Sequence, residues 1–149
     1  MQPLRLNEFL PYRLSVLAAV VSEGLARSYS EQFGIGVPEW RVMATIGEFR
    51  SITAKAIGEH AHMGKVKVSR AVASLEGRGL IQRTQNAEDM REAFLVLMPA
   101  GDDMYRQIVP MALGYAETLR AGLSRDEVAV LDQLIDKLMA RATVMPSAG

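Results

Sequence analysis

The most distinctive chemistry in this sequence lies in a twenty-residue segment, Gly64 to Arg83, which carries five basic residues and one acidic residue. The whole chain is formally neutral, with 17 Lys and Arg against 17 Asp and Glu. Positive charge gathered in one place favours a local anionic partner, such as the phosphates of a nucleic acid. An ordinary solvated helix with the same charges is the alternative that charge alone leaves open.

If this segment is helical, its side chains separate into two faces. The apolar face holds Val68, Ala71, Val72 and Leu75. The basic face holds Lys67, Arg70, Ser74 and Arg78, and the first turn adds Lys65 and Ser69. Arginine can bond bidentately to guanine, lysine neutralises phosphate, and the small serines allow close approach in the major groove. These six polar residues are therefore predicted to contact DNA.

The segment before the basic helix supplies the support that such a helix needs. Pro38 opens an apolar helix that runs to about residue 49. Thr53 can cap a short helix over residues 53–60, and a tight turn then leads into the basic helix. This order of helix, turn and helix is typical of DNA-binding proteins, and Thr53 is included in the predicted DNA-contacting set.

The segment after Gly79 changes to residue types suited to strands. Residues 80–85 and 92–98 predict a β-hairpin with a charged loop between them. In that loop Asp89 can steady the guanidinium of Arg91, so that Arg91 projects beside the groove. The lobe over residues 38–98 is thus a predicted winged helix-turn-helix.

Longer helices are predicted on both sides of this lobe. Apolar residues recur helically after Pro11 up to about residue 32, and again from Pro99 to about residue 120. A capping box of Ser124 and Glu127 starts a last helix. The fold class is therefore mainly α with a small β-hairpin wing, in one domain over residues 1–149.

Several short motifs carry a resemblance to the MarR family of bacterial transcription regulators. They are W-x-x-M at Trp40, V-S-R at Val68, L-E-x-x-G-L-I-x-R at Leu75, D-x-R at Asp89 and L-x-P-A-G at Leu97. The resemblance covers roughly residues 10–142. The chain departs from the family at Met98-Pro99, where a threonine helix cap is usual. It departs again at Lys65 and Lys67, where small hydroxyl residues are frequent, so the operator sequence is not carried over.

The resemblance implies a homodimer that binds double-stranded DNA at a pseudo-palindromic operator. The helices within residues 5–33 and 99–143 would form the dimerisation region, and each winged lobe would present one recognition helix. The implied role is a cytoplasmic repressor that a small-molecule effector releases from DNA. The alternative is a winged-helix protein used for protein contacts or chromosome structuring, without a ligand response.

The resemblance also implies an effector pocket between the dimerisation region and the lobe. Trp40, Met43 and Arg13 are its candidate residues, with Arg13 pairing with the carboxylate of an aromatic acid or of its coenzyme A thioester. Each has a plainer interpretation. Trp40 and Met43 fit a hydrophobic core, and Arg13 fits a surface ion pair.

The sequence gives little support to other classes of function. There is no cysteine, which excludes disulfides and thiol chemistry, and the two histidines are too poorly spaced to share a metal. We expect no metal, no cofactor and no enzymatic activity, because no glycine-rich phosphate loop or catalytic constellation is evident. No apolar run approaches the length that a membrane span requires.

Overall fold

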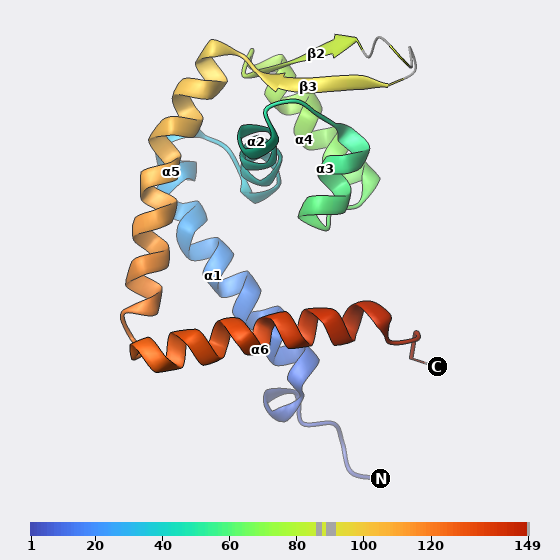
Figure 1. Ribbon diagram of the computed structural model, residues 1–149, viewed down its shortest axis with the longest axis vertical. Coiled ribbons are helices and arrows are strands. Elements are labelled where there is room, and N and C mark those ends of the chain that lie inside the picture. The colour runs from blue at the N-terminus through green and yellow to red at the C-terminus, as the bar shows by residue number, and fades with distance from the viewer. Residues whose placement is uncertain (86–87, 89–91, 149) are drawn as a thin grey trace. The chain divides into compact units, whose positions relative to one another are not determined.

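The computed structural model describes residues 1–85, 88 and 92–148 (Figure 1). A short 3₁₀ helix, η1 (Leu6–Glu8), leads into the first long helix. The elements are η1, α1 (Leu10–Phe33), α2 (Val37–Phe49), β1 (Ile52–Thr53), α3 (Ala54–Ala61), α4 (Lys65–Gly77), β2 (Ile81–Gln85), β3 (Ala93–Leu97), α5 (Pro99–Arg120) and α6 (Arg125–Val144). The predicted class, mainly helical with a small winged sheet, is confirmed.

Local capping explains where several helices begin. The Thr53 hydroxyl accepts a hydrogen bond from the Ala56 amide at 3.2 Å, as an N-cap residue does. The predicted capping box of Ser124 and Glu127 is formed at the start of α6, with donor-to-acceptor distances of 2.8 and 3.1 Å. These polar residues fix the start of α3 and of α6.

The sheet has three antiparallel strands, with β3 between β1 and β2. Ile81 pairs with Leu97 in the hairpin, and Ile52 pairs with Leu95 on the other side of β3. The hairpin was predicted and the third strand was not. β1 has only two residues, and it becomes a strand because β3 lies beside it.

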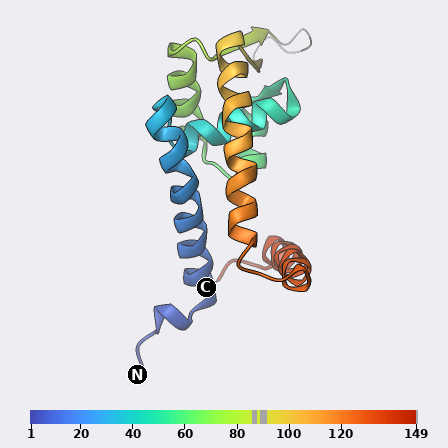
Figure 2. The same cartoon turned by 90° about the vertical axis from the view of Figure 1, so that its left-hand side faces the viewer.

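The core is built from the faces that α2, α3 and α4 turn toward one another and toward the sheet. Figures 1 and 2 show α2 between the end of α1 and α3. Tyr29 of α1 and Met104 and Ile108 of α5 complete the core. The chain divides into two compact units, Met1–Met111 and a second unit that starts at Ala112. The first unit is larger than the lobe predicted for residues 38–98, because it includes α1 and the first half of α5.

Helices α1 and α6 carry many large apolar side chains that the single chain leaves exposed. On α1 they include Leu10, Leu14, Val16, Leu17 and Val20, each at least 41% exposed. On α6 they include Val130, Leu131, Leu134, Ile135, Leu138 and Met139, each at least 40% exposed. Both helices were predicted from their apolar periodicity, yet within this chain α6 has no buried residue.

Candidate nucleic-acid interface

The basic segment forms α4, and its two faces separate as predicted. Val68, Ala71, Val72 and Leu75 are at most 3% exposed and pack in the core. Lys65, Lys67, Ser69 and Arg70 are exposed to solvent. Before α4, the chain turns at His62, which has left-handed backbone angles (φ 50°, ψ 49°). The helix is thus fixed on its apolar side and open on its basic side.

Ser74, predicted to contact DNA, is occupied by an intramolecular hydrogen bond. Its hydroxyl donates to Oε2 of Glu39 at 2.6 Å. The other carboxylate oxygen of Glu39 accepts from the Gly36 amide at 3.0 Å, at the start of α2. Glu39 therefore ties the exposed side of α4 to the first turn of α2.

Arg78 also has partners that the helical pattern did not indicate. Its guanidinium donates to the carbonyl oxygen of Phe33 at 2.8 Å and to that of Gly34 at 3.4 Å. The prediction extended the helix through Arg78, whereas α4 ends at Gly77 and Arg78 is its C-cap residue. The side chain consequently points to the end of α1, where free carbonyl groups attract a cation.

The single acid of the segment, Glu76, is paired with Arg83. One guanidinium nitrogen of Arg83 lies 3.0 Å from the Glu76 carboxylate, and a second lies 3.1 Å from both of its oxygens. Arg83 stands in β2, as the sequence predicted. This ion pair joins the end of α4 to the wing and neutralises the acid.

The remaining predicted DNA-contacting residues fall in three groups. Thr53 is half-buried and caps α3, and a DNA contact from it stays a prediction. Asp89 and Arg91 lie outside the described residues. Contacts of Lys65, Lys67, Ser69 and Arg70 with DNA likewise stay predictions, although their exposure leaves them accessible.

The three candidate effector residues have different surroundings in the structure, and a shared effector site stays a prediction. Trp40 is half-buried between two aromatic rings, with centroid distances of 5.8 Å to Tyr29 and 6.1 Å to Tyr105. Met43 has no exposed area and belongs to the core, which agrees with its plainer interpretation. Arg13 is exposed on α1.

Burial raises the pKa of Tyr29 above its ordinary 10.0, and the charge of Arg41 partly offsets that rise.

The described residues support neither a metal site nor a membrane-spanning helix. No three histidine or acidic side chains within residues 1–85, 88 and 92–148 come together as metal ligands. In the same part of the chain, no helix is both apolar enough and long enough to cross a membrane.

Comparison with known proteins points to one family. Residues 35–93 match the model of the MarR family. The transcriptional regulator HosA of Escherichia coli O127:H6 is 28% identical over 123 residues, which cover 83% of this chain and 91% of HosA. The similarity to HosA therefore extends beyond the winged lobe into the flanking helices.

Two solved structures share the fold. A mutant MarR from E. coli, complexed with operator DNA, has a TM-score of 0.75 and 23% identity, over 91% of this chain and 99% of that protein. NadR in complex with 4-hydroxyphenylacetate has a TM-score of 0.75 and 20% identity, over 93% and 97% of the two chains.

Proposed function

We propose that this chain is a homodimeric repressor of a pseudo-palindromic operator, released by a small aromatic acid or its coenzyme A thioester. The match of residues 35–93 to the MarR family model and the similarity to the transcriptional regulator HosA support this proposal. The observation that carries the proposal is α4, whose apolar side is buried while Lys65, Lys67, Ser69 and Arg70 are exposed. Lys67 and Arg70 enter the major groove, and Lys65 and Ser69 bind phosphate at the start of the helix.

The DNA contacts are tested by two substitutions with different expected effects. Arg70→Ala should weaken binding and blur the preference between bases, because arginine reads guanine edges. Lys65→Ala should weaken binding to all sequences alike, because a phosphate contact carries no sequence information. Binding would be measured by fluorescence anisotropy on the DNA upstream of its own gene and on an unrelated duplex. Equal affinities of both variants and the wild type for the upstream DNA would refute the assignment of α4.

The homodimer is supported by the apolar side chains that α1 and α6 expose. Leu17 is 57% exposed and Leu134 is 50% exposed, and burying such residues stabilises an interface by roughly 25 cal/mol per Å². Leu134→Lys should therefore shift the protein toward monomer in sedimentation velocity at micromolar concentration. Gln133→Lys, at the preceding position of α6, is the matched control and should leave the dimer intact. A wild type that sediments as a monomer would contradict the proposal.

The effector is supported by Trp40, which has aromatic neighbours, and by Arg13, which is exposed on α1. NadR, which shares the fold, binds the phenolic acid 4-hydroxyphenylacetate. A titration of the protein–DNA complex with aromatic acids and their coenzyme A thioesters tests this part. Release of the protein from DNA by one compound would identify the effector. Arg13→Gln should then lower the affinity of the protein for that compound. A protein that dimerises but prefers no DNA sequence would instead favour a role in protein contacts or chromosome structuring.

A further inference from the structure

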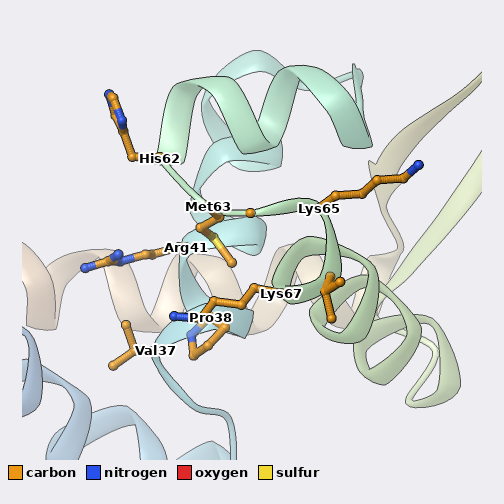
Figure 3. Close-up of a pocket in the computed structure, with 9 residues that line it drawn as sticks. Val37, Pro38, Arg41, His62, Met63, Lys65 and Lys67 are labelled. Atoms are coloured by element: carbon orange, nitrogen blue, oxygen red, sulfur yellow. The ribbon is translucent and has the colours of Figure 1, made fainter. Parts of the chain in front are cut away.

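A basic pocket lies where the start of α2 meets the turn between α3 and α4 (Figure 3). Its volume is about 530 Å³. Its nine lining residues include four that are basic, Arg41, His62, Lys65 and Lys67, and none of these nine is Asp or Glu. Only the two lysines belong to the predicted DNA-contacting set.

Other hollows of the same unit have a different charge balance. The hollow between α3 and α4 includes Glu59 beside Lys55 and Lys65. The hollow on the other side of α4 includes Glu39, and one near the start of α5 includes Asp102. In each of these a carboxylate offsets the basic groups, whereas among its described lining residues the basic pocket has none. Of these four hollows, the basic pocket is therefore the one best suited to an anion.

The basic residues around this pocket belong to separate elements. Lys67 extends across Pro38, whereas the side chains of Arg41, His62 and Lys65 point outward in different directions (Figure 3). Gly64, the N-cap residue of α4, makes no side-chain cap, and the space where its Cβ would stand has nothing within 4 Å. A group seated there could thus reach the first backbone amides of α4 as well as the basic side chains.

We propose that this pocket binds a phosphate of the DNA backbone, and that Arg41 and His62 extend the interface beyond the recognition helix. The inference rests on the proposed function, since it assumes that α4 meets DNA. Lys65 and Lys67 connect the two surfaces, because both residues line the pocket and stand on the exposed side of α4. A phosphate held by α2 and α4 together would fix how far α4 enters the groove.

The test compares Arg41→Gln with two controls. Arg41 donates a weak hydrogen bond within the protein, from Nη2 to the Ser22 hydroxyl at 3.4 Å. Ser22→Ala removes that contact and keeps the charge, and Arg41→Lys keeps a charge at the pocket. Affinity would be measured over a series of salt concentrations, on the DNA upstream of its own gene and on an unrelated duplex.

Loss of one phosphate contact has a recognisable signature. Arg41→Gln should lower the affinity for both duplexes by the same factor. The magnitude of the slope of log affinity against log salt should fall by about 0.9. Ser22→Ala should match the wild type, and Arg41→Lys should restore most of the slope. An Arg41→Gln variant with wild-type affinity and slope would overturn the inference. A wild type that binds neither duplex would instead remove the proposed function.

Free phosphate offers the same chemistry without DNA, so a second measurement separates the two sources. The amide signals of Gly64 and Val66 would be followed by NMR during titration with inorganic phosphate at constant ionic strength, and separately with the duplex. We expect the duplex to shift both amide signals in the wild type, and to shift them less in the Arg41→Gln variant. Shifts caused by inorganic phosphate alone, with DNA binding unaffected by Arg41→Gln, would make the pocket a small-anion site and overturn the assignment to DNA.

Discussion

The tight packing of Gly101 against the start of the wing makes a quantitative prediction. Gly101 is buried in the first turn of α5, and a Cβ added there would lie 1.9 Å from the carbonyl oxygen of Leu80. Ordinary contact begins near 3.4 Å, so one of the two segments must move by about 1.5 Å. That movement would disturb the hydrogen bond from the Met98 amide to the same oxygen, which is 2.9 Å long.

The size of the effect follows from these contributions. Overpacking costs about 1–3 kcal/mol and a lost hydrogen bond about 1 kcal/mol, against about 0.5–1 kcal/mol gained because alanine favours a helix over glycine. Gly101→Ala should therefore lower the free energy of unfolding by about 2 kcal/mol. In urea this corresponds to a midpoint roughly 1 M lower, given a slope near 2 kcal/mol/M.

Gly114→Ala provides the control within the same helix. A Cβ at Gly114 would meet nothing within 4 Å, so this change should stabilise the protein by about 0.5–1 kcal/mol. Both variants would be unfolded in urea at one protein concentration and followed by far-ultraviolet circular dichroism. If Gly101→Ala proved as stable as Gly114→Ala, the close approach of α5 to residue 80 would be refuted.

Three further predictions concern single side chains. Arg78→Gln should lower the free energy of unfolding by about 1 kcal/mol, because its hydrogen bonds to backbone carbonyls are lost. Lys67→Gln should weaken DNA binding and leave the urea midpoint nearly unchanged. Equal urea midpoints for these two variants would contradict the role given to Arg78. Because burial raises the pKa of Tyr29, the folded protein holds that proton more tightly than the unfolded chain, and stability should fall as the pH rises past 10.0; Tyr29→Phe should reduce this loss in urea melts from about pH 8 to 11. The backbone amide of Ser124, and after it the hydroxyl, hold the pKa of Glu127 below its ordinary 4.5. Ser124→Ala keeps the amide and removes the hydroxyl, so it should raise that pKa part of the way, and an NMR titration that found no rise would contradict a contribution from the hydroxyl.

The sequence predicted the elements whose signals are local. Pro38 and Pro99 stand at or beside helix starts, Thr53 and Ser124 cap helices, and apolar periodicity marks the buried side of α4. Each of these depends on residues a few positions apart, which is why one sequence suffices to find them.

What the sequence missed depends on partners far along the chain. Arg78 bonds to a carbonyl 45 residues away, and Ser74 bonds to a carboxylate 35 residues away, so no helical pattern could show that they are engaged. The basic pocket was missed for the same reason, because Arg41 and His62 join Lys65 and Lys67 only once α2 packs beside the turn before α4. The candidate site was thus predictable on one helix, and its extension onto α2 was not.

The aromatic stack around Trp40 gives the molecule an optical property of its own. Trp40 is the single tryptophan of the chain, and its ring lies between Tyr29 of α1 and Tyr105 of α5. Its fluorescence will therefore respond to any shift of α1 or α5 relative to α2. Since the chain also contains no cysteine, one introduced thiol on α4 would carry a dye at a single position in each subunit. Energy transfer from Trp40 to that dye would report movement of α4 in real time, and no native thiol would need to be removed first.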